Sequence, residues 1–463
     1  MDFNKSFVYN VADYGAKGDG FTKDTLAIQR AIDKCSEAGG TVYFPNGRYL
    51  MGTIYMKSGV TLKLEVRATL LGSPELSDYA PDTHYNRYDN EPFMDRCLIY
   101  SHDIEDICIE GPGTIDGQGG CFFDENNPYA PHPMLMRFLK CRNIRLAGFK
   151  VRMPAGWSTA FLECGNVVAD SLDILSRHSN GDGLDFDSCR NVIVSNCRFD
   201  TSDDSICLQN SVKDRPSRNI TVTNCIMTSK WAAVRIGLLS SGDFEHVTFS
   251  NCIFHDIRCS GFKIQSTEGG TIRSMVFQNI VMRNVARPLF LTFNHCHIGA
   301  GAPAKPPETG GISSLRFENI KAVYDPGFKP DPAAGIVIMG TPGHYIKNID
   351  LSGIEFIAPG GWEEEMPDAE AIPELMDCRP ESFVFKRIPA YGIYARHVKG
   401  LRIRDVRLGY DRTDLRPPVF LDDVRDSELS GIWARVDPKT DLLVKRHNSA
   451  DVDETGCRAV HKE

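Results

Sequence analysis

Three aspartate residues, Asp182, Asp203 and Asp204, could support acid–base chemistry because of their type and spacing. Asp182 lies in the segment NGDGLDF, and the adjacent pair Asp203 and Asp204 lies in TSDDSICL further along the chain. Clustered carboxyl groups cannot all ionise cheaply, so the pKa of one group rises and that group can hold a proton. A proton donor beside carboxylates that can accept a proton is an arrangement suited to general acid–base catalysis.

A sequence repeat predicts how these aspartates come together. Similar β-rich runs such as NVIVSNCRF, NITVTNCIM and HVTFSNCIF recur every 27 or 28 residues, and Gly, Asn, Asp and Ser residues separate them. A period of this length, without long helical patterns between the runs, predicts stacked coils of parallel strands about 4.8 Å apart. The Asn residues that end the runs are expected to form an internal amide ladder; these residues are Asn196, Asn224, Asn251, Asn279 and Asn319.

We therefore predict an all-β, single-domain parallel β-solenoid over residues 1–463. The segment 22–40 predicts one amphipathic helix, capped by Asp24 or Thr25, which would cover the open first coil. Irregular stretches rich in Gly, Pro and acidic residues are expected to leave the solenoid as loops that close one end of a groove. These stretches are residues 297–311, 324–334 and 358–390.

Superposing the repeats predicts an outward column of charged side chains. Apolar residues alternate inward along each strand, so Asp185, Cys207, Arg235 and Lys263 between them are expected to point to solvent. Arg235 and Lys263 would add a cationic flank to the acidic centre. Such a surface suits a carbohydrate that carries an anionic group.

Longer motifs resemble the polygalacturonase family, glycoside hydrolase family 28. They are VADYGAKGDGFTKDTLAIQRAID, GGTVYFPNGRYLMGTI, GPGTIDGQG, NGDGLDFDSC and DTSDDSICL. The resemblance implies a right-handed parallel β-helix that cleaves pectin-type oligosaccharides. It also implies that Asp203 is the general acid and that Asp182 and Asp204 activate water. In such a single displacement the acid and base stand about 6.5–9.5 Å apart, and the anomeric carbon is inverted.

The chain departs from the family at two substrate-binding motifs. Trp231 and two alanines stand where the family has Gly-His-Gly, and Lys263-Ile264-Gln265 stands where it has Arg-Ile-Lys. A lysine lacks the two-pronged geometry of arginine, and Gln265 is neutral. Arg235 would then either replace the missing guanidinium or remain a solvated surface residue. Trp231 would either stack on a sugar or be structural.

Three function classes remain open from the sequence. A glycosidase acting on galacturonide, rhamnogalacturonide or another sugar needs no metal and no cofactor. A β-helix polysaccharide lyase would need a cation such as calcium and a basic side chain that removes a proton. A non-catalytic carbohydrate-binding β-helix would use the acids only to orient sugar hydroxyls.

The charge composition disfavours two classes of binding partner. With 61 acidic against 52 basic residues, the net charge of -9 and the absence of a dense Lys/Arg run disfavour nucleic acid or an anionic membrane as partner. An oligosaccharide is the expected partner, and the sequence leaves the oligomeric state open.

The 15 cysteines show no CxxC pair, and no signal-peptide pattern begins the chain, so we expect free thiols and a cytoplasmic location. Cytoplasmic placement favours exo-acting cleavage of imported oligosaccharides.

Overall fold

The fold is a right-handed parallel β-helix, as the repeat and the resemblance predicted. The structure is a computed structural model that describes residues 7–83, 95–124, 126–127, 130–293, 309–330, 335–363, 372–374, 381 and 388–461. Two compact units divide the chain. The N-terminal unit comprises Met1–Cys207 and Ser217–Ile226; the C-terminal unit comprises Leu208–Pro216, Met227–Ile298 and the chain from Ala302 onward. β20 (Ile206–Asn210) and β22 (Ile226–Ser229) span the boundaries between these segments.

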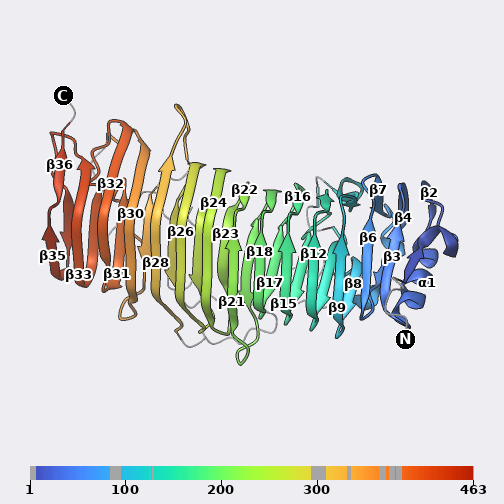
Figure 1. Ribbon diagram of the computed structural model, residues 1–463. Coiled ribbons are helices and arrows are strands. Elements are labelled where there is room, and N and C mark those ends of the chain that lie inside the picture. Colours follow the sequence, from blue (N-terminus) through green and yellow to red (C-terminus); the bar gives the residue numbers. More distant parts are fainter. Residues whose placement is uncertain are drawn as a thin grey trace. The chain divides into compact units, whose positions relative to one another are not determined.

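The N-terminal unit stacks three parallel sheets (Figure 1). Its first sheet contains β5 (Ile54–Tyr55), β8 (Cys97–His102), β11 (Met134–Leu139), β14 (Thr159–Leu162) and β17 (Leu184–Asp187). Its second sheet contains β1 (Val8–Asn10), β3 (Gly40–Phe44), β6 (Val60–Leu64), β9 (Glu105–Glu110), β12 (Arg142–Ala147), β15 (Gly165–Asp170), β18 (Arg190–Ser195) and β21 (Ser217–Thr223). Its third sheet contains β2 (Asp19–Lys23), β4 (Gly47–Met51), β7 (Ala68–Gly72), β10 (Thr114–Asp116), β13 (Lys150–Arg152), β16 (Asp173–Ser176) and β19 (Arg198–Thr201). Short 3-10 helices occupy Val11–Tyr14, Leu76–Asp78, Pro81–Thr83 and Gly119–Phe122.

The C-terminal unit contains the same kind of coil, with longer strands. Its first sheet contains β23 (Ala232–Ser240), β25 (Ser260–Ser266), β27 (Leu289–Phe293), β29 (Ile336–Met339), β31 (Ile393–Lys399), the start of β33 and β34 (Val444–His447). Long strands form the rest of each coil: β24 (Phe244–Ile257), β26 (Thr271–Val285), β28 (Gly311–Val323), β30 (Ile346–Gly360), β32 (Arg402–Arg412) and β33 (Val419–Arg435), followed by β35 (Ala450–Thr455) and β36 (Arg458–Val460).

Columns of identical side chains fill the core. Phe138, Phe161 and Phe186 occupy equivalent positions of β11, β14 and β17, and all three are fully buried. Their ring centroids lie 5.1 and 4.8 Å apart, with nearly parallel planes. Because the strand spacing matches the stacking distance of aromatic rings, each coil adds one ring to the column.

The predicted asparagine ladder forms, but it is exposed instead of internal. In the N-terminal unit the amide of Asn224 donates to Asn196 at 3.4 Å, and in the C-terminal unit that of Asn279 donates to Asn251 at 3.0 Å. These residues have φ between 55° and 58°, a left-handed turn conformation that Asn tolerates better than most residues. The turn directs each amide along the solenoid axis at the surface, while the following Cys or Ile fills the interior. A second exposed ladder that the sequence analysis did not identify joins Asn143, Asn166, Asn191 and Asn219.

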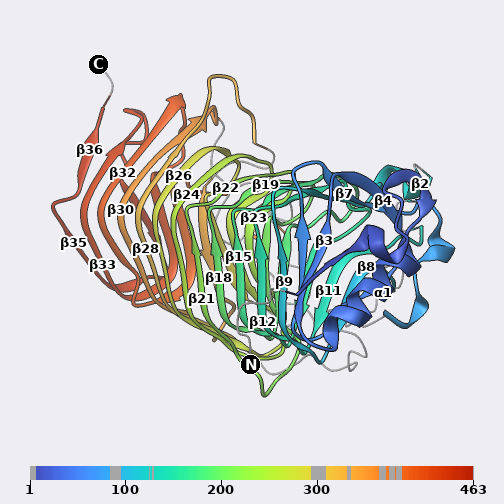
Figure 2. The ribbon, with the colours of Figure 1, turned by 45° about the vertical axis from the view of Figure 1, so that its right-hand side comes forward.

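The predicted helix is α1 (Thr25–Ser36), which covers the first coil beside β1 and β3 (Figure 2). Its inner face is the predicted one, with Ala27, Ile28, Ala31 and Ile32 buried. Asp24 is at the N-cap position, but its carboxylate accepts the backbone N–H groups of Lys17 at 2.7 Å and Gly18 at 2.9 Å. Asp24 therefore fixes the preceding loop in place of capping the helix.

The predicted loops are described only in part. Residues 297–308 lie outside the described residues, and residues 358–360 belong to β30. Tyr324 stacks on Phe328 at 5.2 Å and donates its hydroxyl to the carbonyl of Val285 at 2.7 Å, so this stretch folds back on the coil. Parts of 361–390 pack on the first sheet of the C-terminal unit, as described below.

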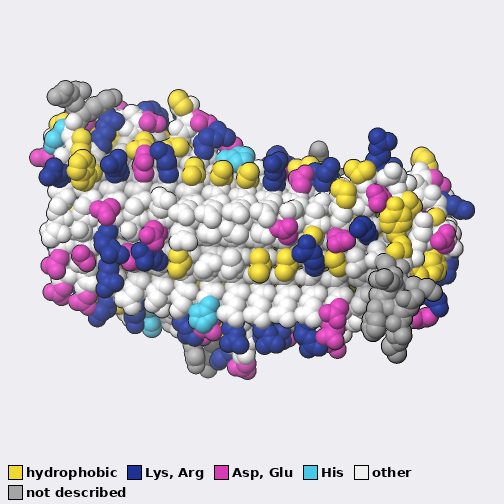
Figure 3. Space-filling view, viewed as in Figure 1, with side chains coloured by type: hydrophobic (Ala, Val, Ile, Leu, Met, Phe, Trp, Pro, Cys, Tyr) yellow, Lys and Arg dark blue, Asp and Glu magenta, His cyan; other side chains and the backbone are white. Residues whose placement is uncertain are grey.

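No helix in the described ranges has both the length and the apolar composition that a bilayer crossing would need. On the face in Figure 3, hydrophobic side chains occur mostly as separate spots among uncharged side chains and backbone. Exposed residues such as Ile193, Ile253 and Val281 are each about half accessible.

Replacing Phe161 with Ala should lower the free energy of unfolding by about 3–5 kcal/mol, because it opens a cavity in the middle of the ring column. Phe21→Ala is the matched control, since Phe21 is 87% exposed, and it should change stability by less than about 0.5 kcal/mol. Urea unfolding monitored by tryptophan fluorescence measures both changes. Equal destabilisation by the two substitutions would show that the column does not support the coil stack.

Candidate functional site

The three predicted aspartates lie on two successive turns of the N-terminal unit. Asp182 is in the turn between β16 and β17, and Asp203 and Asp204 are in the turn between β19 and β20, one coil further on. One carboxylate oxygen of each residue lies within 4.8 Å of the others. Asp182 and Asp204 are buried, whereas Asp203 is half-buried. The structure therefore brings together the cluster that the repeat predicts.

Backbone hydrogen bonds between coils fix the two turns. Gly183 donates its N–H to the carbonyl of Asp204 at 2.9 Å, and Asp203 donates to the carbonyl of Gly181 at 3.4 Å. Within the second turn, the N–H of Asp204 donates to Oδ1 of Asp203 at 2.9 Å. Main-chain hydrogen bonds thus help to fix the relative positions of the carboxyl groups.

The two glycines of the NGDG segment allow this close approach. A Cβ atom at Gly183 would lie 2.2 Å from the carbonyl oxygen of Ser205, and one at Gly181 would lie 2.6 Å from Oγ of Ser202. Both separations are far below van der Waals contact. Any larger residue would push the two turns apart.

His178, to which the sequence analysis gave no role, lies in the same turn as Asp182. Its ring faces Phe123 at a centroid distance of 6.2 Å, and burial lowers its pKa. Burial also lowers the pKa of His132, and charge on His178 lowers it further. Both imidazoles are therefore neutral at neutral pH, so they add hydrogen-bonding groups and not positive charge to this part of the unit.

The expected outward column is buried, which corrects the prediction of solvent exposure. Asp185 and Cys207 are 2% and 1% exposed, and Arg235 and Lys263 are 6% and 0% exposed. In the C-terminal unit the cover comes from the insertion that follows β30. The alternation of side chains places these residues on the outer face of the strands, but it does not reveal what lies on that face.

Lys263 forms an ion pair with a residue that the sequence analysis did not single out. The ammonium of Lys263 donates to Oε2 of Glu381, which is itself 2% exposed. Arg235 is directly opposite Lys263 on the neighbouring strand, and its Nη2 lies 3.9 Å from Oε1 of Glu381. One carboxylate of the chain therefore contacts both cations that were expected to hold a substrate carboxylate.

Trp231 and Gln265 complete the neighbourhood of this ion pair. The ring of half-buried Trp231 lies 4.9 Å from the ammonium of Lys263, close enough for a cation–π interaction. Gln265 is fully buried, and its amide lies 3.4 Å from the hydroxyl of Thr292 on β27. Both side chains thus have partners within the protein.

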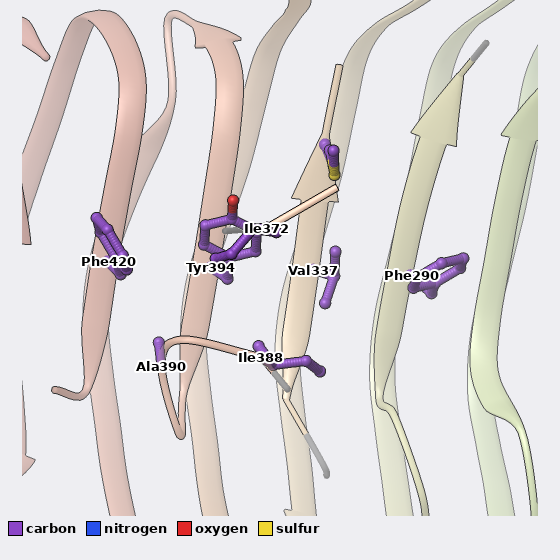
Figure 4. Close-up of a cluster of buried hydrophobic side chains, with 8 residues drawn as sticks. Phe290, Val337, Ile372, Ile388, Ala390, Tyr394 and Phe420 are labelled. Atoms are coloured by element: carbon purple, nitrogen blue, oxygen red, sulfur yellow. The ribbon is translucent and has the colours of Figure 1, made fainter. Parts of the chain in front are cut away.

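The insertion is anchored by an apolar cluster (Figure 4). Outward positions of the first sheet carry hydrophobic side chains in the C-terminal unit, and buried residues of the insertion lie on them. The cluster consists of Phe290, Val337, Met339, Tyr394 and Phe420 from the strands and Ile372, Ile388 and Ala390 from the insertion. The insertion is therefore part of the core of this unit.

Charged residues beside the cluster hold the insertion as well. Glu374 pairs with Arg396 and lies 3.2 Å from Nε2 of His397, whose Nδ1 lies 2.7 Å from Asp423. Burial of the imidazole lowers its pKa, but the hydrogen bonds to Glu374 and Asp423 outweigh this effect and raise the pKa of His397. The protonated form of His397 is therefore the form that this contact favours.

The acid cluster has the donor set of a cation site or of an acid–base pair. Its three carboxylates offer oxygen ligands, although calcium prefers six to eight. In an acid–base reaction, one protonated carboxyl group donates a proton while the others accept one from water. Both chemistries use the same residues.

Sequence reasoning missed Glu381 because nothing in the segment around it marks a partner. It lies 118 residues from Lys263, within a stretch without periodicity. A signal for the covered outer face did exist, however. β27 and β29 read LFLTF and IVIM, and continuous apolar runs are typical of strands buried on both faces.

Comparisons with known proteins place the chain among carbohydrate-active β-helices. The model of the glycosyl hydrolases family 28 matches residues 35–370. The exo-poly-alpha-D-galacturonosidase of Dickeya chrysanthemi is 29% identical over 60% of this chain, and the match spans only 56% of the relative's length. Polygalacturonase-2 of Solanum lycopersicum is 27% identical over 80% of this chain and 84% of its own.

Solved structures of low identity share the fold. The exopolygalacturonase of Thermotoga maritima has a TM-score of 0.66 at 22% identity, over 76% of this chain and 88% of its own. The family 28 exopolygalacturonase of Yersinia enterocolitica has a TM-score of 0.64 at 22% identity, over 99% of this chain and 78% of its own.

Substituting Gly183 with Ala should slow any reaction of the acid cluster by about 100-fold, because a shift of about 1 Å between reacting groups has that effect. Gly165→Ala is the control, since a Cβ there meets Arg190 only at an ordinary 3.6 Å. Steady-state rates of the two purified variants test this expectation. A full rate in the Gly183→Ala variant would contradict the tight packing of the turns.

Because the pKa of His397 is raised in the folded chain, its contribution to stability should be present below pH 6.5 and lost as pH rises through the folded pKa. His397→Gln should therefore lower the melting temperature more at pH 5.5 than at pH 8. The corresponding loss in the free energy of unfolding at pH 5.5, relative to that at pH 8, is on the order of 1 kcal/mol. A melting-temperature difference that is constant with pH would show that His397 is neutral in the fold.

Proposed function

The chain belongs to the glycosyl hydrolases family 28, and on that premise we propose that it hydrolyses pectin-type oligosaccharides, galacturonide or rhamnogalacturonide, with Asp182, Asp203 and Asp204 as catalytic residues. The observation that carries this proposal is the convergence of the three carboxyl groups on two stacked turns. Relatives named as polygalacturonases support the substrate class.

In the proposed reaction, Asp203 donates its proton to the departing glycosidic oxygen as the bond from that oxygen to the anomeric carbon breaks. Water attacks the same carbon from the opposite face, and Asp182 or Asp204 accepts the proton that water loses. Oδ1 of Asp203 accepts the N–H of Asp204, which helps to hold this carboxyl group in its turn. The half-buried position of Asp203 supports contact with a leaving group.

We further propose that the reaction inverts the anomeric carbon. Family membership is the support for inversion. The distance between carboxylate oxygens does not add to it, because these oxygens lie within 4.8 Å of one another, whereas the acid and base of inverting enzymes are typically about 6.5–9.5 Å apart. The anomer formed first, followed by NMR on a defined oligosaccharide, tests this assignment. Retention would require one aspartate to attack carbon directly.

Exo action on short, imported oligosaccharides in the cytoplasm completes the proposal. The insertion after β30 packs on outward positions from β27 to β33, and an irregular segment of this kind is one that we expect to limit access in an exo-acting enzyme. The name of the Dickeya chrysanthemi relative also supports exo action. Every cysteine in the described part of the chain is a free thiol, as in proteins of a reducing compartment. Product lengths at early times test the mode of cleavage, because random internal fragments would contradict it.

A lyase is the second candidate, because three clustered carboxylates could also bind calcium. Activity that is lost with a chelator and yields an unsaturated, ultraviolet-absorbing product would favour it. Activity that survives the chelator and yields a saturated product would favour the hydrolase.

Asp203→Asn should lower the rate on a natural oligosaccharide by about 10²–10⁴-fold, because the leaving oxygen loses its proton donor. On an activated aryl glycoside, whose leaving group departs without protonation, the loss should be much smaller. Asp182→Asn and Asp204→Asn should be impaired on both substrates, because water must be activated in either case. Steady-state kinetics on the substrate pair measures the contrast.

Asp200→Asn serves as the control for this series, since Asp200 pairs with Arg177 outside the cluster and should keep a near-normal rate. Selective rescue of Asp204→Asn by the activated substrate would exchange the acid and base assignments. Near-normal rates in all three cluster variants would place the site elsewhere. If the unsubstituted protein hydrolyses any glycoside and Asp203→Asn no longer does, the non-catalytic alternative is eliminated.

A further inference from the structure

We propose that Ser158 and Ser202 are positioning residues for the proposed reaction, because their hydroxyl groups hold the turn of Asp182 from the two neighbouring coils. They set the position of Asp182 relative to Asp203 on the next turn. This inference rests on the proposed function, and all the residues that carry it belong to the N-terminal unit. Asp182 and the glycines on either side of it are buried, so the backbone groups of this turn need partners inside the protein.

The hydroxyl of Ser202 makes two hydrogen bonds to the segment that leads into Asp182. It donates to the carbonyl of His178 and accepts the N–H of Gly181 at 3.1 Å. A hydroxyl can donate and accept at once, so this one side chain satisfies two backbone groups. Because Ser202 directly precedes Asp203, the two bonds join the turn of Asp182 to the turn of the proposed acid.

The side chain of Ser202 strengthens a place where the backbone bond between the turns is long. Asp203 donates its N–H to the carbonyl of Gly181 at 3.4 Å, which is beyond the usual length of such a bond. The N–H of Ser202 itself donates to the carbonyl of Ser176 at 2.8 Å. The hydroxyl therefore projects from a fixed backbone and reinforces the weaker bond beside it.

Ser158 holds the same turn from the preceding coil. Its N–H donates to the carbonyl of Asp182 at 3.1 Å, and its hydroxyl donates to the carbonyl of Gly183 at 2.6 Å. Ser158 is fully buried, so water does not compete for these bonds. The backbone after the side chain of Asp182 is thus held from one coil, and the backbone before it from the other.

Loss of either hydroxyl should change the distance between the catalytic carboxyl groups. Without Ser202 Oγ, the buried N–H of Gly181 loses a hydrogen bond, and an unsatisfied buried group favours movement of the turn. Rates depend steeply on the placement of reacting groups. Because both hydroxyls bind backbone groups of the protein, we expect their loss to lower kcat and to leave KM nearly unchanged.

The experiment measures kcat and KM on a galacturonide and a rhamnogalacturonide oligosaccharide of defined length. Ser202→Ala should lower kcat by at least about tenfold and change KM by less than about twofold. Ser158→Ala should act in the same direction, and it carries the test if Ser202→Ala fails to fold. Ser202→Thr keeps the hydroxyl, so its kcat should stay within about threefold of that of the unsubstituted protein.

Ser195→Ala is the matched control, since it removes a half-buried hydroxyl of the same unit away from the acid cluster. Ser195 donates to Oδ1 of Asp170 at 2.6 Å, and its loss should leave kcat unchanged. Melting temperatures of all variants identify a temperature at which each one is folded. The rates are compared at that temperature, so that a loss of stability is not mistaken for a loss of positioning.

An unchanged kcat in Ser202→Ala, or an equal loss of kcat in Ser195→Ala, would overturn this inference and leave the proposed function intact. A rise of KM at constant kcat would overturn it too, because it would show that the serine binds substrate. If the unsubstituted protein hydrolyses neither oligosaccharide, the proposed function fails, and the inference with it.

Discussion

Parallel strand pairing between successive coils organises both units of the chain. Each strand of a unit bonds to its counterpart one coil away in register, as β14 does with β17 and β23 with β25. Equivalent residues are therefore held about 4.8 Å apart along a column. Phenylalanine rings in the interior and asparagine amides at the turns use this spacing repeatedly, and each added coil extends several favourable columns at once.

The acid cluster is a consequence of the same pairing at a position where like charges meet. Backbone bonds between the turns of Asp182 and Asp204 bring carboxyl groups together that would otherwise repel one another. Gly183 makes the approach possible because it has no Cβ to meet Ser205. The stability of the coil stack thus offsets the cost of assembling an arrangement that is useful for acid–base chemistry.

The insertion after β30 imposes a second, non-repeating layer on the C-terminal unit. Its apolar residues pack on outward side chains of the first sheet, and Glu381 neutralises Lys263 beneath it. Without that carboxylate, burial of the lysine would carry a large desolvation cost. Hydrophobic docking and charge compensation therefore act together, and they turn a surface that a bare solenoid would expose into interior.

The features that repeat can be predicted from the sequence alone. Its period predicts the solenoid, its Asp182 and Asp204 motifs mark equivalent turns, and its apolar spacing marks the inner face of α1. What lies outside the strands becomes visible only in the folded chain: the exposed position of the asparagine ladder, the burial of the Arg235 and Lys263 column, and the pairing of Lys263 with Glu381. The physical reason is that periodic hydrogen bonding is encoded locally, coil by coil. The contact across 118 residues depends instead on where an irregular chain finds a complementary surface, and no spacing in the sequence specifies that.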